Sequence, residues 1–232
     1  MSASLPLLSS KTLMRGAPNF DGLARVYRWM EYLSFGPMLS RCRTEFISRL
    51  SNCRSALVIG DGDGRFTARL LATNPLIHID AIDASPEMLR ALVRRAGNDA
   101  FRVRAEVHDA RAWTPNHDAH YDLVVTHFFL DCLTTAEIES LAQRIAAVSA
   151  PGALWVISEF AIPESWFGRF IARPLIAALY CAFGLLTGLH IRNLPDHHTA
   201  LAAAGFQPVA RRTWLSGLLE SELLVRASCE RR

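Results

Sequence analysis

A short stretch in the first third of the chain combines residue types that could hold a ligand. Residues 58–71 read VIGDGDGRFTARLL, with three glycines and two aspartates close together. The glycines are Gly60, Gly62 and Gly64, and the aspartates are Asp61 and Asp63. Because glycine lacks a Cβ, a glycine-rich bend after a buried strand lets the backbone approach a ligand closely. We therefore expect a binding loop here.

The spacing within this loop excludes three common ligand motifs. A calcium loop starting at Asp61 would need glycine where Phe66 stands and glutamate where Ala72 stands. A P-loop needs lysine and a hydroxyl residue after its last glycine, where this chain has Arg65 and Phe66. The dinucleotide fingerprint G-x-G-x-x-G would place its last glycine at Arg65. The loop is therefore neither a calcium loop nor one of these phosphate cradles.

The two aspartates narrow the chemistry of the ligand. Carboxylates beside a helix N-terminus repel a phosphate, although the helix end alone would attract one. They suit a ligand that carries an ammonium group and a carboxylate. The alternative is structural, since Asp61 and Asp63 could simply cap the helix that follows.

Two further aspartates follow later predicted strands. Asp83 ends the second strand, 23 residues after Gly60, where an acid can accept hydrogen bonds from both hydroxyls of a ribose. Asp109 follows the third strand and is placed to meet an adenine amino group. Either one alone is an ordinary loop aspartate. Together with the glycine loop, they predict a nucleoside-like ligand at successive strand ends.

The elements that must position these residues alternate along the chain. Apolar runs predict strands at 55–60, 77–83, 101–107, 121–129 and 152–160, with helices at 65–72, after Ser85-Pro86 and at 136–150. Thr134 and Glu137 form a capping box for the last of these helices. A helix at 196–206 precedes a hairpin of strands 207–215 and 217–227, with a tight turn at Ser216-Gly217. The alternation predicts an α/β fold with a parallel sheet covered on both faces.

With these motifs in this order, the chain resembles the class I S-adenosylmethionine-dependent methyltransferases over about residues 20–227. VIGDGDG resembles the first motif of the family, IDAIDASPEML the second, VHDA the adenine motif and YDLVVTHFFLD the fourth-strand motif. FDGLARVYRWMEYLSFG and PGALWVISEF are similar to the small-molecule branch that includes ubiquinone and menaquinone C-methyltransferases. The resemblance implies a Rossmann-like, mostly parallel seven-stranded sheet with helices on both faces and a C-terminal antiparallel hairpin.

The resemblance also implies which residues hold S-adenosyl-L-methionine. Gly60, Gly62 and Gly64 would lie along the methionine part. Asp83 with Ala84 would hold the ribose, Asp109 with Ala110 would frame the adenine, and His127 would also contact the cofactor. The family commonly has an acid two residues before the first glycine, where this chain has Val58. We expect Asp61 or Asp63 to substitute for it.

Methyl transfer from a sulfonium is a direct displacement, so the protein mainly aligns the reacting atoms. A base is needed only when the acceptor must lose a proton. The candidates lie beyond the strand tips: His127 and Asp131 after the fourth strand as catalytic residues, and Glu159 after the fifth as a substrate contact. Each also has a structural interpretation, as a packed histidine, a helix cap or a buried acid.

The insert at 162–192 is apolar and aromatic, and we expect a helical lid over the active-site mouth. Trp166, Phe170 and Tyr180 suit a flat or apolar acceptor, although core packing or a dimer contact would explain them equally. Tyr27 and Arg43, in predicted N-terminal helices at 20–52, could close over the cofactor and substrate. Residues 1–19 are interpreted as a loose leader, and 20–232 as a single methyltransferase domain.

Composition limits the kinds of binding partner and the cellular compartment that fit this chain. The net charge of +3 with scattered basic residues argues against nucleic-acid binding. Five widely spaced cysteines without a CxxC pair indicate a reducing, cytoplasmic compartment. His190, His197 and His198 form no recognised zinc spacing, so no metal is expected. The uncharged run 174–189 falls short of the roughly 20 residues of a membrane span, but 166–189 is a candidate for peripheral membrane contact, and a homodimer is compatible with it.

The sequence thus predicts a cytoplasmic methyltransferase that transfers a methyl group from S-adenosyl-L-methionine to a small, apolar or aromatic acceptor, with membrane association as an open alternative. Two alternatives stay open. One is a non-catalytic S-adenosylmethionine-binding protein with a regulatory or assembly role. The other is a peripheral membrane protein that works mainly through residues 174–189.

Overall fold

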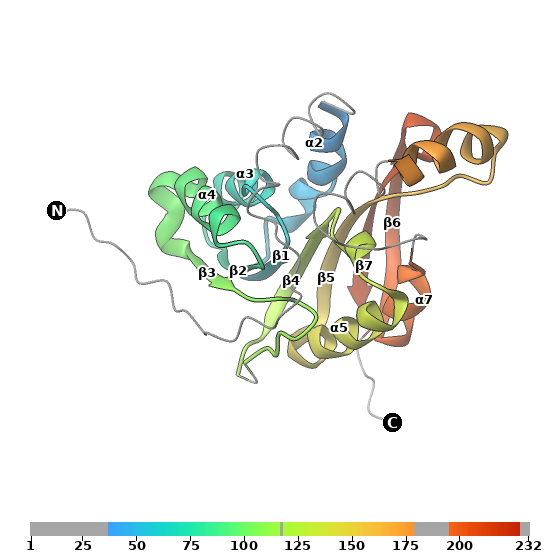
Figure 1. The fold of residues 1–232 in the computed structure, drawn as a ribbon. Helices are drawn as coiled ribbons and strands as arrows, with labels where there is room; N and C mark the ends of the chain where they lie inside the picture. Colours follow the sequence, from blue (N-terminus) through green and yellow to red (C-terminus); the bar gives the residue numbers. More distant parts are fainter. Residues whose placement is uncertain (1–36, 117, 179–194, 228–232) are drawn as a thin grey trace.

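The computed structural model describes residues 37–116, 118–178 and 195–227. They form a seven-stranded sheet in the order β3-β2-β1-β4-β5-β7-β6, in which β7 alone runs antiparallel to its two neighbours (Figure 1). The strands are β1 Ser55–Ile59, β2 His78–Asp83, β3 Val103–Val107, β4 Tyr121–His127, β5 Ser149–Phe160, β6 Phe206–Trp214 and β7 Leu219–Arg226. The predicted α/β fold with a C-terminal antiparallel hairpin is confirmed.

Helices cover both faces of the sheet (Figure 1). They are α2 Pro37–Thr44, α3 Arg65–Thr73, α4 Pro86–Ala96, α5 Thr135–Val148 and α7 His197–Ala203, with 3-10 turns η1 Ile47–Leu50, η2 Gly97–Arg102, η3 Leu130–Cys132 and η5 Leu215–Gly217. One core packs α3, α4 and η1 against one face, and a second core packs α5 and α7 against the other. The central strands are buried on both faces, as a parallel sheet requires.

Local signals set several helix starts as predicted. The Ser85 side chain accepts from the Met88 amide, and Pro86 begins α4. Thr134 and Glu137 form the predicted capping box at the start of α5. Each cap satisfies amides that a helix start would otherwise leave without partners.

The strand boundaries differ from the prediction by one to three residues, and two of these differences have a clear local cause. The third strand begins at Val103 instead of residue 101, because Phe101 and Arg102 end a 3-10 helix. The buried Arg102 guanidinium donates to three carbonyl oxygens, those of Leu71, Asn74 and Ile77. The fourth strand ends at His127, because Phe128 takes a φ of 53° and turns the chain out of the sheet. This turn matters for the site.

Several predicted segments fall partly or wholly outside the described residues. Those are the leader 1–19, the first part of the N-terminal helices at 20–52, and most of the second half of the lid at 162–192. Within the lid, residues 166–178 are helical, with a π-helical turn at Gly168–Ala172. No helix in the described part of the chain is long and apolar enough to cross a membrane.

Candidate functional site

The glycine loop joins β1 to α3 through three left-handed residues. Gly60, Gly62 and Gly64 have φ values of 71°, 59° and 79°. A Cβ on Gly60 would lie 2.5 Å from the Phe129 ring, and one on Gly64 would lie 2.6 Å from the Cα of Leu92. A Cβ on Gly62 would come no closer than 3.9 Å, to the sulfur of Met88. Packing within the protein therefore requires two of the glycines, whereas a Cβ on the third would make only an ordinary contact.

The two aspartates of the loop have different partners. One carboxylate oxygen of Asp61 accepts from the Thr67 amide in the first turn of α3, at 2.9 Å. The Asp63 carboxylate pairs with Arg95 at 2.7 Å and with Arg65 at 3.3 Å. Both therefore stabilise the loop, in agreement with the structural interpretation. Burial raises the pKa of Asp61, and the amide of Thr67 and the charge of Arg43 only partly offset that effect.

The predicted ribose and adenine residues follow the next two strands, as expected. Asp83 ends β2, half-buried, and accepts from the Ser85 amide at 2.8 Å; Ala84 beside it is exposed. Asp109 follows β3 and forms a bidentate pair with Arg111, which lowers its pKa despite partial burial. Ala110 is buried.

The segment after Asp109 is fixed to the helix layer. Arg144 of α5 donates to the carbonyl oxygens of Ala110, Arg111 and Trp113. Three backbone acceptors in one segment thus share one guanidinium. The position of the predicted adenine-framing residues is therefore set by α5.

His127 ends β4, directly beside the glycine loop. The parallel register pairs Thr126 with Ile59, so that His127 and Gly60 are the next residues on the two strands. The His127 ring is 3% exposed and packs edge-on against Phe66, with ring centroids 4.5 Å apart. Neither ring nitrogen has a hydrogen-bond partner among the described residues. Burial, with the nearby charge of Arg43, lowers the pKa of His127 well below its usual value, so the ring is neutral at pH 7.

The turn after β4 connects the glycine loop with Glu159 at the end of β5. The Phe129 ring covers Gly60, while the Glu159 carboxylate accepts the amides of Phe129 and Leu130 at 3.1 and 2.9 Å. Asp131 follows in the same turn and is 5% exposed. Burial, reinforced by the charge of Asp131, raises the pKa of Glu159 well above its usual value. Two carboxyl groups are therefore brought together here.

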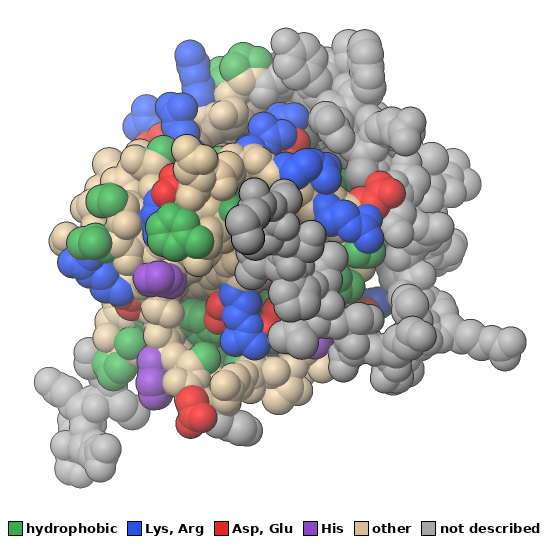
Figure 2. All heavy atoms as spheres, turned by 90° about the vertical axis from the view of Figure 1, so that its left-hand side faces the viewer, with side chains coloured by type: hydrophobic (Ala, Val, Ile, Leu, Met, Phe, Trp, Pro, Cys, Tyr) green, Lys and Arg blue, Asp and Glu red, His purple; other side chains and the backbone are tan. Residues whose placement is uncertain are grey.

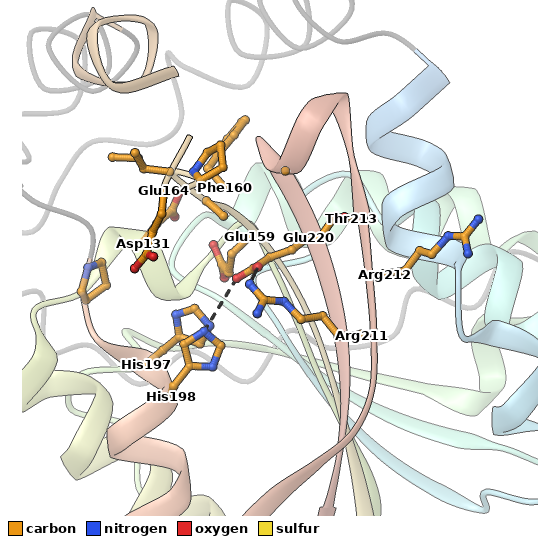
Figure 3. Close-up of a pocket in the computed structure, with 15 residues that line it drawn as sticks. Asp131, Glu159, Phe160, Glu164, His197, His198, Arg211, Arg212, Thr213 and Glu220 are labelled. Carbon is orange, nitrogen blue, oxygen red and sulfur yellow. Dashed lines mark hydrogen bonds and ion pairs between the residues drawn. The ribbon is translucent and has the colours of Figure 1, made fainter. Parts of the chain in front are cut away.

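These carboxyl groups line a cavity of about 920 Å³ between β5, the β6–β7 hairpin and α7 (Figure 3). Its charged lining residues are Asp131, Glu159, Glu164, His197, His198, Arg211, Arg212 and Glu220, and its apolar ones include Phe160, Ile162 and Pro163. Figure 3 shows Arg211 directed at Glu220, whereas Arg212 points away from the cluster. The cavity thus has a charged wall and an apolar side.

Sequence reasoning missed the charged wall. Glu220 and Glu222 lie on β7, both 3% exposed, and Arg211 of β6 pairs with both. The alternation of β7 was an available signal, because the two glutamates share a face with the buried Leu224. The cross-strand pairing of Glu159 with Glu220 was not, since it depends on the register of the sheet.

The other predicted substrate residues lie apart from this cavity or outside the described residues. Trp166 and Phe170 are each 70% exposed on the helical segment 166–178 and do not line the cavity. Tyr27 and Tyr180 fall outside the described residues. On the face shown in Figure 2, the described arginines are dispersed among acidic and apolar side chains.

Comparisons with known proteins show what the chain is similar to. The family described as "Methyltransferase domain" matches residues 56–152. Trans-aconitate 2-methyltransferase of Mycobacterium tuberculosis (strain ATCC 25177 / H37Ra) is 31% identical over 147 residues, which are 61% of this chain and 52% of that protein. The Rhodococcus jostii (strain RHA1) enzyme of the same name is 35% identical over 99 residues, or 42% and 36% of the two chains. The chain spans about half the length of the first of these relatives.

Solved structures of low sequence identity share the fold. A putative O-methyltransferase from Nostoc punctiforme PCC 73102 has a TM-score of 0.66 at 20% identity, covering 94% of this chain and 64% of that one. The N-methyltransferase NodS from Bradyrhizobium japonicum WM9, in complex with S-adenosyl-L-homocysteine, has a TM-score of 0.56 at 17% identity, covering 82% and 88%.

Proposed function

We propose that this chain is a class I S-adenosylmethionine-dependent methyltransferase that transfers a methyl group to a small molecule bound in the cavity beside Glu159. The observation that carries the proposal is the turn after β4. It places Phe129 on the glycine loop and Asp131 in the cavity, so one short segment links the two sites. A methyl donor over the loop and an acceptor in the cavity would meet at this turn.

The residues around the glycine loop fit the cofactor. Gly62 leaves room for close backbone approach, while Asp61 and Arg43 offer opposite charges to the ammonium and carboxylate of a methionine. The buried His127 nitrogens lack a hydrogen-bond partner among the described residues and would gain one from a polar ligand group. When bound, S-adenosylmethionine supplies the methyl group on a sulfonium. Asp83 with Ala84 would then face the ribose, and Asp109 with Ala110 the adenine.

The cavity indicates the chemistry of the acceptor. Its carboxylic acids outnumber its arginines, four to two, and Arg211 is already paired with Glu220. A tricarboxylate such as the trans-aconitate of the relatives' name would meet net repulsion there. The apolar side at Phe160, Ile162 and Pro163 suits an apolar or aromatic body. We therefore favour a small acceptor with an apolar body and one protic group, a hydroxyl or an amine.

Glu159 and Asp131 are the residues placed to take the proton of that group. They are buried together, and the raised pKa of Glu159 lets one carboxyl hold a proton while the other is charged. The charged member accepts the acceptor's proton as the new bond forms. His127 lies on the glycine-loop side and does not line the cavity, so we assign it to the cofactor.

A labelled-donor assay tests the activity. The chain is incubated with methyl-labelled S-adenosylmethionine and phenolic, arylamine and trans-aconitate acceptors. We expect transfer to a phenol or arylamine, and a drop of about 100-fold or more in kcat for Asp131→Asn. Glu139→Gln, an exposed change on α5, serves as the control. Cofactor binding by calorimetry without transfer to any acceptor would favour the non-catalytic alternative, and transfer to trans-aconitate alone would refute the acceptor class.

The loop aspartates can be separated by the same calorimetry. Because Asp63 is bound to two arginines, we expect Asp63→Asn to leave cofactor affinity nearly unchanged. Asp61→Asn should weaken it about tenfold, since Asp61 is the acid that remains to take the place of the one missing at Val58. Equal effects of the two variants would contradict this assignment.

We also propose that the helical segment 166–178 contacts a membrane surface. Trp166 and Phe170 are exposed beside the exposed Arg169 and Arg173, a combination typical of interfacial helices. The double variant Trp166→Ser/Phe170→Ser should lose binding to phosphatidylglycerol vesicles, whereas Phe101→Ser, 76% exposed elsewhere, should retain it. Equal sedimentation of the parent protein and both variants with the vesicles would refute the membrane contact. A change from dimer to monomer in the double variant would instead indicate that this surface binds a second copy of the chain.

A further inference from the structure

Four metal-ligating side chains converge in the wall of the cavity. His197 and His198 begin α7, and Glu220 of β7 lies beside them (Figure 3). Glu222, two residues further along β7, completes the cluster. One ligand atom from each residue lies within 4.8 Å of the other three. The glycine loop follows β1 on a different part of the sheet, so this cluster is separate from the proposed cofactor site.

The distances within the cluster are close to those of a coordination shell. Glu222 Oε2 lies 3.3 Å from Nδ1 of His198 and 3.8 Å from Nε2 of His197. The other nitrogen of the same ring, His198 Nε2, lies 3.8 Å from Glu220 Oε1, and one ion would take only one of the two nitrogens. Ligands bound tetrahedrally at about 2.0–2.2 Å stand roughly 3.3–3.6 Å apart, so only small side-chain shifts separate the cluster from such a shell.

Two buried atoms of the cluster lack hydrogen bonds. His197 Nε2 and Glu222 Oε2 have no hydrogen-bond partner among the described residues, and their residues are 8% and 3% exposed. Buried polar atoms are normally paired, because burial removes their hydrogen bonds to water. A buried atom that finds no new partner therefore costs free energy. Both atoms point at the same small space, which is where a cation would satisfy them together.

The charges of the cluster also leave room for a cation. Glu220 and Glu222 are two buried carboxylates on one strand face, and the single guanidinium of Arg211 pairs with both. Arg211 is about half exposed and balances one of the two charges. Two buried carboxylates therefore share one guanidinium, and a buried carboxylate without a full partner favours a nearby cation.

We propose that His197, His198, Glu220 and Glu222 form a binding site for a divalent transition-metal ion of the zinc class. Imidazole nitrogens with carboxylate oxygens are a donor set that Zn²⁺ prefers, and calcium or magnesium would favour oxygens alone. Since His197, His198 and Glu220 line the cavity, water or a ligand oxygen has access to the metal.

Metal binding to the full-length chain tests the site without any need for methyl transfer, so the result is independent of the proposed function. The chelator-treated protein is titrated with Zn²⁺ by calorimetry and with Co²⁺ by visible absorption. We expect one equivalent of either metal, with tetrahedral Co²⁺ bands, and affinity weaker by about tenfold or more in Glu222→Gln and His198→Asn. The control is His120→Asn, an exposed histidine away from the cluster, which should bind as the parent does.

Each outcome of the metal titration either supports or overturns the proposed metal site. His198 is about half exposed, so its variant keeps the fold intact if Glu222→Gln does not fold. Absence of stoichiometric binding in the parent protein would overturn the proposal. So would equal affinity in His198→Asn and His120→Asn, because the metal would then be held elsewhere.

Discussion

The glycine loop and the charged cavity wall are built by opposite means. The loop uses backbone geometry, with three left-handed glycines in five residues and aspartates that find partners on α3 and α4. The wall uses side chains that arrive from β5, β6, β7 and α7. The loop is therefore encoded by consecutive residues. The wall forms only when the register of the sheet brings residues distant in sequence together.

Electrostatics differs between two buried glutamates on the side of the wall. In the wall, burial and Asp131 raise the pKa of Glu159. On the neighbouring strand, burial would raise the pKa of Glu222, but His197, His198 and Arg211 outweigh it and lower the pKa. Two buried glutamates on adjoining strands therefore favour opposite protonation states. The neighbouring charged and hydrogen-bonding groups therefore set the favoured protonation state of each glutamate, and burial alone does not.

The largest effect is expected from packing in the loop. Gly64→Ala places a Cβ 2.6 Å from the Leu92 backbone at a φ of 79°, and should lower the free energy of unfolding by about 3–5 kcal/mol. Gly205→Ala has a similar φ of 88° with nothing within 4 Å, and should cost only about 1 kcal/mol. Urea denaturation measures both. Equal losses would mean that backbone conformation, and not contact with α4, fixes the loop.

Glu159 tests the wall through pH. Because its folded pKa lies above the unfolded value, its contribution to stability is complete below the ordinary glutamate pKa and is lost as pH rises toward the folded one. Glu159→Gln keeps an oxygen for the amides of Phe129 and Leu130 but removes the titration. Between pH 4.5 and 8, the parent should lose about 1–3 kcal/mol relative to the variant in urea unfolding. Parallel curves would contradict a buried, protonated Glu159.

Glu222 should show the opposite dependence. Its folded pKa is lowered, so its contribution is present above the unfolded value and is lost as pH falls through the folded one. In chelator, Glu222→Gln should cost about 1 kcal/mol at pH 7 and less at pH 3.5, measured by urea unfolding. Glu139→Gln is the exposed control. A cost that grows toward low pH would mean that His197, His198 and Arg211 do not stabilise the charged form.

The contrast explains what the sequence could predict. The alternation of strands and helices, the capping box at Thr134 and the place of Asp83 and Asp109 follow from periodicity and local motifs, and the structure has them where they were expected. The loop aspartates were predicted with two interpretations. The contacts of Asp63 with Arg95, 32 residues away, are tertiary, so no local pattern could choose between those interpretations.

The wall escaped prediction because its members are distant in sequence. The histidines of α7 lack a second ligand pair at zinc-motif spacing, and the glutamates that meet them stand on β7, beyond an intervening strand. The strand end at His127 was also placed too late, since the left-handed Phe128 carries no sequence signal. That turn is what brings Asp131 to Glu159, so the acid pair depended on a feature invisible in the residue pattern.

A stability effect as small as that of Gly205→Ala is expected at Gly62, the loop glycine that the protein crowds least. Gly62→Ala meets only the Met88 sulfur at 3.9 Å and keeps a φ of 59°, so it should cost about 1 kcal/mol in urea unfolding. If the open side of Gly62 receives the cofactor, the added methyl should nevertheless weaken S-adenosylmethionine binding about tenfold in calorimetry. Gly205→Ala, with an equal stability cost, should leave that affinity unchanged. Unchanged affinity in Gly62→Ala would mean that the loop's conformation serves only to connect β1 with α3, and that the ligand lies elsewhere along the strand ends.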